Sequence, residues 1–521
     1  MWRARNQDEL ASLFDIVVRH ALDYLGRDTK HPLSTHEAHQ LLRTQLGGDL
    51  PAAGQGSTEV LEQFIAAAEP GLSPSTSGRF FGFVTGGAYP VAVATEWLTS
   101  IWDQTPVLHV SSPAAAVVEE TVAGWLTQLF GLPTATSVGI TTGCAAANLI
   151  GLAAARHHVL AAVGWDVGSA GLIGAPAPRV LASRGCHVTV TRAARLLGLG
   201  GQIHLVDTDE AGRMRLDHLA DLLATTHGPL IVCGEVGNVD TGAVDPVAAV
   251  AELTHAHGGW LHLDAAFGMW AAASPRLRAT VPGLAGLDRA DSWATDAHKW
   301  LNVPYDCGIA LCAHPAAHLA ALRAQADYLP SASDGVRHPM DYTPEMSRRA
   351  RALVLWTTLR HLGADGVAEL VERCCALARR MADQLARVDG VTVLAEVTLN
   401  QVLVRFTPPP HGRSPDPRDA AAAWDPAAYE TPAEDAHTEA VVGAFQRGGV
   451  GWASPTRWRG RTALRLSVCN WQTDAATVDA AVAALVTAHR APPPAAVTAH
   501  PPALPRPSHP HDDDLIPEGT A

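Results

Sequence analysis

One lysine of the chain lies where its amine is better suited to covalent chemistry than to contact with water. Lys299 lies between His298 and Trp300 in the run ADSWATDAHKWLNVPYDCG, a weakly charged stretch followed by an apolar strand. An amine in such surroundings loses solvation of its ammonium form and becomes a better nucleophile. We therefore expect it to form an imine with an aldehyde cofactor. Taken alone, the pattern fits an ordinary strand-end lysine, with a buried stem and a hydrated head, equally well.

A carboxylate follows an expected strand upstream of this lysine. In GGWLHLDAAFG the apolar residues 260–263 lead to Asp264, at the carboxyl end where parallel α/β sheets collect their ligands. A carboxylate there can pair with a protonated pyridine nitrogen and keep the ring an electron sink. A helix cap or a structural salt bridge is the alternative for an isolated aspartate at a strand end.

Two further elements can serve the same edge of the sheet. In GITTGCAAANLIGLAAAR a turn at residues 141–143 opens an Ala-rich helix, whose free N–H groups and positive dipole end suit a phosphate. His187 follows a strand and precedes an amphipathic helix, although packing or capping is the commoner role of such a histidine. The order of turn, histidine, aspartate and lysine within one α/β pattern favours a common site.

The surrounding elements alternate as a parallel sheet requires. Between residues 76 and 345 short apolar runs such as RVLAS, PLIVCGEV and CGIALC alternate with Ala-rich helical stretches, which indicates β-α-β units covered on both faces. Residues 1–75 show helical spacing, and residues 346–490 combine helices with the short strands VTVLA, NQVLVRF and ALRLSVCN. We predict an N-terminal helical segment, a large domain and a smaller C-terminal α+β domain. We expect the Pro/Asp/Ala-rich stretch 407–436 to be an inserted loop and the tail 491–521 to be disordered.

Composition narrows the class of protein. The 521 residues are 47% hydrophobic and 17% charged, with a net charge of −14, which argues against nucleic acid or an anionic membrane as the main partner. The eight cysteines form no Cys-x-x-Cys pair, so neither a metal site nor a disulfide framework is indicated. With no signal peptide or membrane-spanning stretch recognised, we expect a cytoplasmic protein.

Together these residues resemble the group II decarboxylases that depend on pyridoxal 5'-phosphate (PLP), among them the aromatic-L-amino-acid, glutamate and diaminobutyrate decarboxylases. The likeness runs from about residue 79 to about residue 484 and is most specific at DAHKW and HLDAAFG, with support from TTGCAAANL, SRRARALVLWTTLRHLG and LSVCNWQTDAATV. It implies the fold-type I architecture, an α/β large domain with a mostly parallel seven-stranded sheet. It also implies a homodimer with active sites at the subunit interface.

The resemblance assigns roles to individual residues. Lys299 matches the Schiff-base lysine, Asp264 the partner of the pyridine nitrogen, and His187 the histidine that stacks on the cofactor ring. Further matches, all implied as cofactor contacts, are Gly143, Cys144 and Ala145 in the phosphate turn, His298 at the phosphate, and Ala266 in HLDAAFG.

This chain departs from the family pattern at several positions. Ala145 replaces a Ser or Thr and Ala146 a Glu, so phosphate binding would rely on backbone N–H groups and Thr142. The segment 237–239 reads Gly-Asn-Val instead of Gly-Thr-Thr, which leaves Asn238 as the polar contact. Phe83 is expected on a wall of the substrate pocket, and the run Trp102, Asp103, Gln104 and Thr105 in the neighbouring subunit's site.

The expected reaction is decarboxylation of an L-amino acid to the amine and carbon dioxide through a Schiff base and a quinonoid. Alternatives are another PLP reaction, such as oxidative deamination to an aldehyde or an aminotransferase-type exchange, and a non-catalytic PLP-binding protein. Tyr342, in PSASDGVRHPMDYTPEMSRRAR, matches the mobile-loop tyrosine that returns a proton to the α-carbon. A turn residue that packs on its neighbours is an equal alternative for it.

Overall fold

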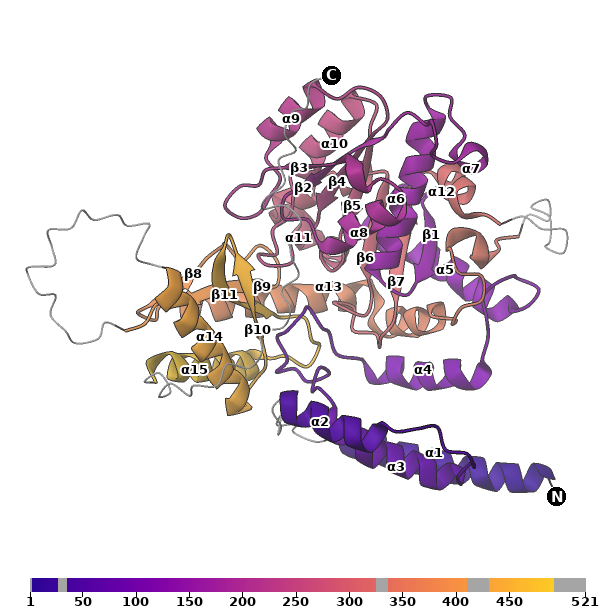
Figure 1. The fold of residues 1–521 in the computed structure, drawn as a ribbon, viewed down its shortest axis with the longest axis vertical. Helices are drawn as coiled ribbons and strands as arrows, with labels where there is room; N and C mark the ends of the chain where they lie inside the picture. Colours follow the sequence, from indigo (N-terminus) through magenta and orange to yellow (C-terminus); the bar gives the residue numbers. More distant parts are fainter. Residues whose placement is uncertain (1, 27–34, 325–335, 410–430, 492–521) are drawn as a thin grey trace, which may run out of the picture.

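A seven-stranded sheet forms the centre of the molecule (Figure 1). The computed structural model describes residues 2–26, 35–324, 336–409 and 431–491. The strand order is β1-β7-β6-β5-β4-β2-β3, and only β7 runs antiparallel to its neighbours. The strands are β1 (Ser137–Thr141), β2 (Arg179–Ser183), β3 (Ile203–Val206), β4 (Leu230–Glu235), β5 (Trp260–Asp264), β6 (Ser292–Asp296) and β7 (Gly308–Cys312). This is the mostly parallel seven-stranded sheet that the sequence predicts.

Helices cover both faces of this sheet, as the uninterrupted apolar strands require. In β4, Ile231 packs into the cluster that contains α6 and α8, whereas the next residue, Val232, packs into the cluster that contains α9 and α10. The helices of this region are α4 (Pro90–Trp102), α5 (Pro113–Phe130), α6 (Cys144–Ala161), α7 (Val167–Ala170), α8 (Val188–Leu196), α9 (Leu216–Ala224), α10 (Val247–Ala256), α11 (Pro275–Thr280) and α12 (Pro315–Leu322). The carboxyl ends of the parallel strands therefore open at one edge between two helical layers.

A smaller α+β unit follows along the chain. Its antiparallel sheet has the order β10-β11-β9-β8, from β8 (Val391–Val393), β9 (Gln401–Phe406), β10 (Ser454–Trp458) and β11 (Arg461–Ser467). Helix α13 (Ala352–Leu385) packs on α4 and α5 at one end and on α15 (Ala475–Arg490) and β9 at the other. It therefore joins the two units. Helix α14 (Thr431–Gly448) begins inside the stretch expected to be a loop, so that expectation is wrong from residue 431 onward. The expected disordered tail, 491–521, lies outside the described residues except for its first position.

Three N-terminal helices form a separate layer below the large sheet (Figure 1). They are α1 (Trp2–Gly26), α2 (Thr35–Leu46) and α3 (Ser57–Ala68), and α3 contacts both of the others. Helix α1 carries exposed apolar side chains at helical spacing, namely Leu10, Phe14, Val18, Leu22 and Leu25. None of the helices in the described parts of the chain is long and apolar enough to cross a bilayer.

Candidate active site

Lys299 lies in the turn that follows β6, directly beyond the carboxyl edge of the sheet. Its Nζ is 2.9 Å from Oδ2 of Asp296, the last residue of β6. Burial, the largest single effect, lowers the pKa of this amine, but the charge and hydrogen bond of Asp296 together with the charges of Cys144 and Asp264 outweigh burial and raise the pKa above its usual value. The expectation that desolvation makes Lys299 a free amine is therefore wrong for the chain alone, because an aspartate three residues earlier holds the amine as an ammonium ion.

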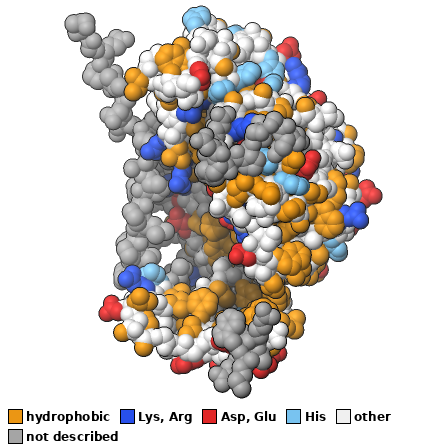
Figure 2. All heavy atoms as spheres, turned by 90° about the vertical axis from the view of Figure 1, so that its right-hand side faces the viewer, with side chains coloured by type: hydrophobic (Ala, Val, Ile, Leu, Met, Phe, Trp, Pro, Cys, Tyr) orange, Lys and Arg blue, Asp and Glu red, His pale blue; other side chains and the backbone are white. Residues whose placement is uncertain are grey.

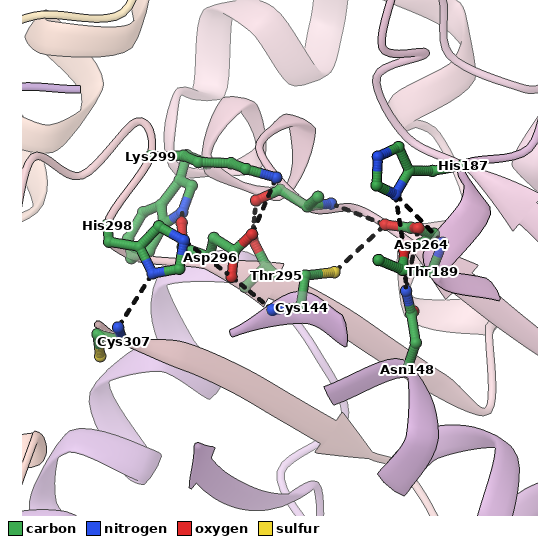
Figure 3. A network of polar contacts seen from close by, with 12 residues as sticks. Cys144, Asn148, His187, Thr189, Asp264, Thr295, Asp296, His298, Lys299 and Cys307 are labelled. Atoms are coloured by element: carbon green, nitrogen blue, oxygen red, sulfur yellow. Dashed lines mark hydrogen bonds and ion pairs between the residues drawn. The ribbon is translucent and has the colours of Figure 1, made fainter. Parts of the chain in front are cut away.

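Asp264 ends β5 on the neighbouring strand, and its carboxylate accepts hydrogen bonds at both oxygens. The thiol of Cys144 (3.3 Å) and the backbone N–H of Ala266 (3.2 Å) donate to Oδ1, and the amide of Asn148 donates to Oδ2 (3.1 Å). Burial, followed by the charges of Asp264 and Asp296, raises the pKa of Cys144 well above its usual value, so its thiol stays neutral and can donate. Figure 3 shows Lys299 and Asp264 on opposite sides of Cys144. Three donors therefore satisfy the oxygens of this buried side chain.

His187 is the residue that caps α8. Its Nδ1 lies 2.8 Å from Oγ1 of Thr189, and it also accepts from the backbone N–H of Thr189. Burial lowers the pKa of this imidazole, partly offset by the charge of Asp264. The ring is therefore neutral near pH 7 and is fixed at one nitrogen by α8.

The turn from β1 into α6 presents a helix N-terminus to the same region. Gly143 caps α6, and the backbone N–H of Cys144 donates to Asp296 Oδ1 at 2.5 Å. A Cβ on Gly308 of β7 would lie 2.3 Å from Gly143 Cα, so the strand and the turn meet this closely only because residue 308 is a glycine. Thr142 and Ala145 are exposed at this turn. The N-terminus of an 18-residue helix therefore lies beside the lysine and can bind an anion.

His298 lies between this turn and β7. Its Nδ1 accepts from the backbone N–H of Cys307 (3.0 Å), its Nε2 is 3.5 Å from Asp296 Oδ1, and its ring packs on Tyr305. Burial lowers its pKa, against the opposing charge of Asp296. The position beside the α6 N-terminus is compatible with the expected phosphate contact.

Lys299, Asp264 and His187 open into one cavity of about 310 Å³, whereas residues 142–145 and His298 are not among its lining residues. Its walls include the predicted residues Phe83, His187, Asp264, Ala266 and Lys299. Residues that the sequence analysis did not assign also line it, among them Val84, Glu235, Phe267 and Arg465. Burial, followed by the charges of Asp245 and Asp264, raises the pKa of Glu235 well above its usual value. The cavity thus combines two basic side chains, Lys299 and Arg465, with the carboxyl groups of Asp264 and Glu235, a neutral imidazole and apolar walls.

Besides residues 142–145 and His298, the predicted residues Asn238 and Tyr342 also lie outside the cavity lining. The amide of Asn238 donates to Glu235 (3.2 Å) and accepts from the backbone N–H groups of residues 240 and 241, so it organises its own turn, while Val239 lines the cavity. Tyr342 has its ring under the guanidinium of Arg337 (3.9 Å to the ring centre) and beside His318. It is not among the residues that line the cavity of its own chain. Its role as proton donor remains a prediction.

Sequence reasoning missed the residues that hold the site together. Asp296 precedes Lys299 by three positions in TDAHKW, a spacing that could have revealed the pair. Asn148 and His262 occur in quoted motifs but were treated as helix and strand residues. A simpler signal was also available, since the chain contains only two lysines, Lys30 and Lys299.

The group that the resemblance implies is PLP, and the donors present fit it. PLP requires an amine for its aldehyde, a carboxylate for its ring nitrogen and an anion site for its phosphate. Lys299 and Asp264 supply the first two in the cavity. The N-terminus of α6 does not line that cavity but adjoins it, because Cys144 contacts both Asp296, the partner of Lys299, and Asp264. The donor set therefore matches the cofactor at all three of its ends.

Comparisons with known proteins agree with this geometry. The profile of the pyridoxal-dependent decarboxylase conserved domain matches residues 40–407. A tyrosine decarboxylase from Oryza sativa subsp. japonica is 30% identical over 77% of this chain and 78% of its own. A 4-hydroxyphenylacetaldehyde synthase from Rhodiola rosea is 27% identical over 74% of this chain and 79% of its own.

The fold is also that of a solved structure. Oryza sativa TDC with PLP and tryptamine superposes with a TM-score of 0.81 at 24% identity, covering 92% of this chain and 98% of that one. The profile spans well over half of the chain. The chain therefore belongs to the family of pyridoxal-dependent decarboxylases, enzymes that use PLP to decarboxylate amino acids.

Proposed function

We propose that this chain removes the α-carboxyl group of an L-amino acid with PLP held by Lys299, Asp264 and the turn at residues 142–145. The observation that carries the assignment is the single cavity into which Lys299, Asp264 and His187 all open. Three groups of complementary chemistry on three separate elements, after β6, at the end of β5 and at the start of α8, support one shared purpose better than three structural coincidences.

When bound, PLP supplies an aldehyde that condenses with amines and a pyridinium ring that accepts the electron pair left by departing carbon dioxide. The residues of this chain prepare that chemistry. Asp296 Oδ2, 2.9 Å from Nζ, can take the proton that Lys299 must lose before it becomes nucleophilic. Asp264 offers a fixed negative charge to a ring nitrogen, and neutral His187 can lie against the ring without adding charge.

One assay tests the proposed reaction. Carbon dioxide, amine and hydrogen peroxide are measured for each of the twenty amino acids with the wild-type chain and with Lys299→Ala as the blank. Amine and carbon dioxide in equal amounts for at least one substrate support decarboxylation. Peroxide and aldehyde in place of amine would identify the oxidative alternative, and no product from any amino acid would contradict the proposal.

We further propose a homodimer whose active sites lie at the interface. Helix α4 leaves Trp97, Leu98, Ile101 and Trp102 substantially exposed, and α1 adds its apolar stripe. Figure 2 looks at the side of the molecule that lies to the right in Figure 1, and it shows hydrophobic side chains gathered on the lower half of that side. Exposed apolar surface of this extent is typical of an interface. The symmetry of a closed dimer makes a second copy its simplest partner.

Two finer expectations complete the proposal. Tyr342 is kept as the proton donor, acting across the subunit interface because it lies outside its own cavity. Replacing Tyr342 with Phe should raise the share of peroxide-forming turnover if its hydroxyl delivers the proton.

The eight cysteines are all free thiols, and seven are buried, which supports a reducing, cytoplasmic location.

A further inference from the structure

A line of buried hydrogen bonds runs from the core of the sheet to Asp264. Trp260 Nε1 donates to Ser292 Oγ (2.9 Å), and Ser292 Oγ lies 2.8 Å from His262 Nδ1. On the other side of the ring, His262 Nε2 lies 2.9 Å from Asn148 Oδ1, and Asn148 Nδ2 is 3.1 Å from Asp264 Oδ2. All five side chains are at most 4% exposed. The line therefore has no exchange with solvent along its length.

The direction of each hydrogen bond follows from the Asp264 end of this line. Asp264 as a carboxylate can only accept, so Asn148 turns its NH₂ group toward Asp264 and its Oδ1 toward His262 Nε2. The neutral His262 ring must then carry its proton on Nε2, which leaves Nδ1 to accept the hydroxyl proton of Ser292. The indole N–H of Trp260 can only donate, and Ser292 Oγ can accept from it in this arrangement.

A branch of the line reaches His187. The second N–H of Asn148 points to Thr189 Oγ1 at 3.1 Å, and Thr189 Oγ1 lies 2.8 Å from His187 Nδ1 (Figure 3). The threonine oxygen accepts from Asn148, and His187 Nδ1 already accepts from the backbone N–H of Thr189, so the hydroxyl proton of Thr189 goes to His187 Nδ1. The neutral His187 ring then carries its proton on Nε2, the nitrogen that α8 does not engage. One amide thus orients two residues of the cavity.

We propose that His262 and Asn148 are positioning residues whose one-way hydrogen bonds hold Asp264 as an acceptor and His187 as its Nε2–H tautomer. This inference rests on the proposed function for its catalytic meaning, but the hydrogen-bond direction itself is a property of the chain. Burial lowers the pKa of His262 to about 4, so its ring is neutral over the working range of pH. A protonated ring would donate from both nitrogens and would oppose the hydroxyl of Ser292.

The number of hydrogen bonds that each oxygen of Asp264 accepts indicates where a ring nitrogen can bind. Each carboxylate oxygen has about two acceptor sites. Cys144 and Ala266 occupy both sites of Asp264 Oδ1, whereas Asn148 occupies one site of Oδ2. The free site of Oδ2 is therefore the one left for the pyridinium N–H, on the oxygen that Asn148 steadies.

The first test reads the tautomers directly and needs no turnover. Imidazole ¹⁵N shifts are recorded for the histidine-labelled full chain with and without PLP, and the two rings are assigned with His262→Gln and His187→Asn. Both rings are expected to be neutral, with their protons on Nε2, in either state. A proton on Nδ1 of His262 would overturn the inference whether or not the chain is a decarboxylase.

The second test compares variants of equal size and burial. Asn148→Asp keeps the shape of the side chain but removes both donors, and His262→Phe removes the donor that orients Asn148. His318 serves as the matched control, because it is also fully buried and also bonded to a serine (Ser137, 2.8 Å), but its other ring nitrogen lies 3.1 Å from the backbone carbonyl of Tyr342 rather than on the line to Asp264. The readouts are affinity for PLP from the absorbance of the bound cofactor, and the tautomer of His187.

Asn148→Asp and His262→Phe are expected to weaken PLP binding by about ten-fold or more, the factor that corresponds to about 1.4 kcal/mol. Both are expected to release the His187 tautomer, and His262→Gln, whose Nε2 can still donate to Asn148, should recover much of the loss. His318→Phe should lower thermal stability without either effect. Equal PLP affinity and an unchanged His187 tautomer in His262→Phe would overturn the inference. Failure of the wild-type chain to bind PLP would instead contradict the proposed function.

Discussion

At the residue scale, the central feature is that a carboxylate accompanies each group that must change its charge. Asp296 is paired with the ammonium group of Lys299. Asp264, which Asn148 holds in place, is available to pair with a protonated ring nitrogen. A buried cation without such a partner would cost several kcal/mol, so the pairs allow charged groups to remain in an apolar cavity. The chemistry then requires a proton shift over 2.9 Å rather than the creation of a new buried charge.

The first prediction concerns Lys299. Borohydride reduction of the PLP-bound chain should fix the cofactor to Lys299, because its amine is the one that opens into the cavity. The yellow imine absorbance should disappear on reduction, and a peptide map should place the label at DAHKW. The chain contains one other lysine, Lys30, so Lys30→Ala is a complete control that should label normally. A label on Lys30 would refute the assignment.

The second prediction concerns Asp264. Asp264→Asn keeps the shape of the side chain but removes the charge that stabilises a protonated ring nitrogen, so turnover should fall by about ten-fold to a hundred-fold. The fall should appear in kcat more than in KM, since the charge matters most in the transition state.

Imine formation with Lys299 should survive in this variant. A cofactor analogue methylated at the ring nitrogen, and therefore permanently positive, should restore part of the rate. Normal turnover by Asp264→Asn would reduce Asp264 to a strand-end cap and remove the electron sink from the proposed reaction.

At the element scale, the sequence predicted the cavity residues that follow the strands but not the buried residues that hold them in place. Lys299, Asp264 and His187 could be predicted because each follows an apolar run that ends at the same edge of a parallel sheet. Asn148 and His262 could not, because their link depends on α6 crossing β5, a contact between residues more than 100 positions apart. Asn238 stays a prediction as a cofactor contact, and the sequence did not reveal that its amide serves its own turn.

The third prediction tests that crossing of α6 over β5. A Cβ on Gly151 of α6 would lie 2.6 Å from Cε1 and 2.7 Å from Nδ1 of the His262 ring. Gly151→Ala should therefore push the ring or the helix away and destabilise the fold by about 1–3 kcal/mol. Because His262 moves, bound PLP should also be held less tightly.

Gly124 of α5 provides the matched control, since a Cβ there meets no atom within 4 Å. Gly124→Ala should be neutral or stabilise the helix by up to about 1 kcal/mol. Thermal and denaturant unfolding of both variants checks the pair. Equal stability of Gly151→Ala and the wild type would mean that α6 and β5 are not packed as closely as the structure has them.

At the scale of the whole molecule, the packing of a single chain does not account for the exposed apolar side chains of the N-terminal helices. Helices α1, α2 and α3 pack on one another and form a layer apart from the large sheet (Figure 1). The helical spacing at residues 10–18 was visible in the sequence, but periodicity cannot say which surface an apolar stripe will cover. No residue in the described part of the chain covers the stripe of α1, which remains exposed, and the proposed dimer would supply a cover for it.

The last prediction is that a second copy of this chain covers the stripe. Light scattering at micromolar concentration should report about twice the 54.8 kDa chain mass. Phe14 and Leu22 are 45% and 69% exposed and lie two helical turns apart on one face of α1. Placing charge there by Phe14→Glu with Leu22→Glu should shift the mass toward the monomer and make turnover fall on dilution. Ile173→Glu, at a side chain that is 96% exposed outside the N-terminal helices, should change neither property. A wild-type chain that is monomeric and fully active would refute the shared active site, because Trp102 and its neighbours would then have no cavity to enter.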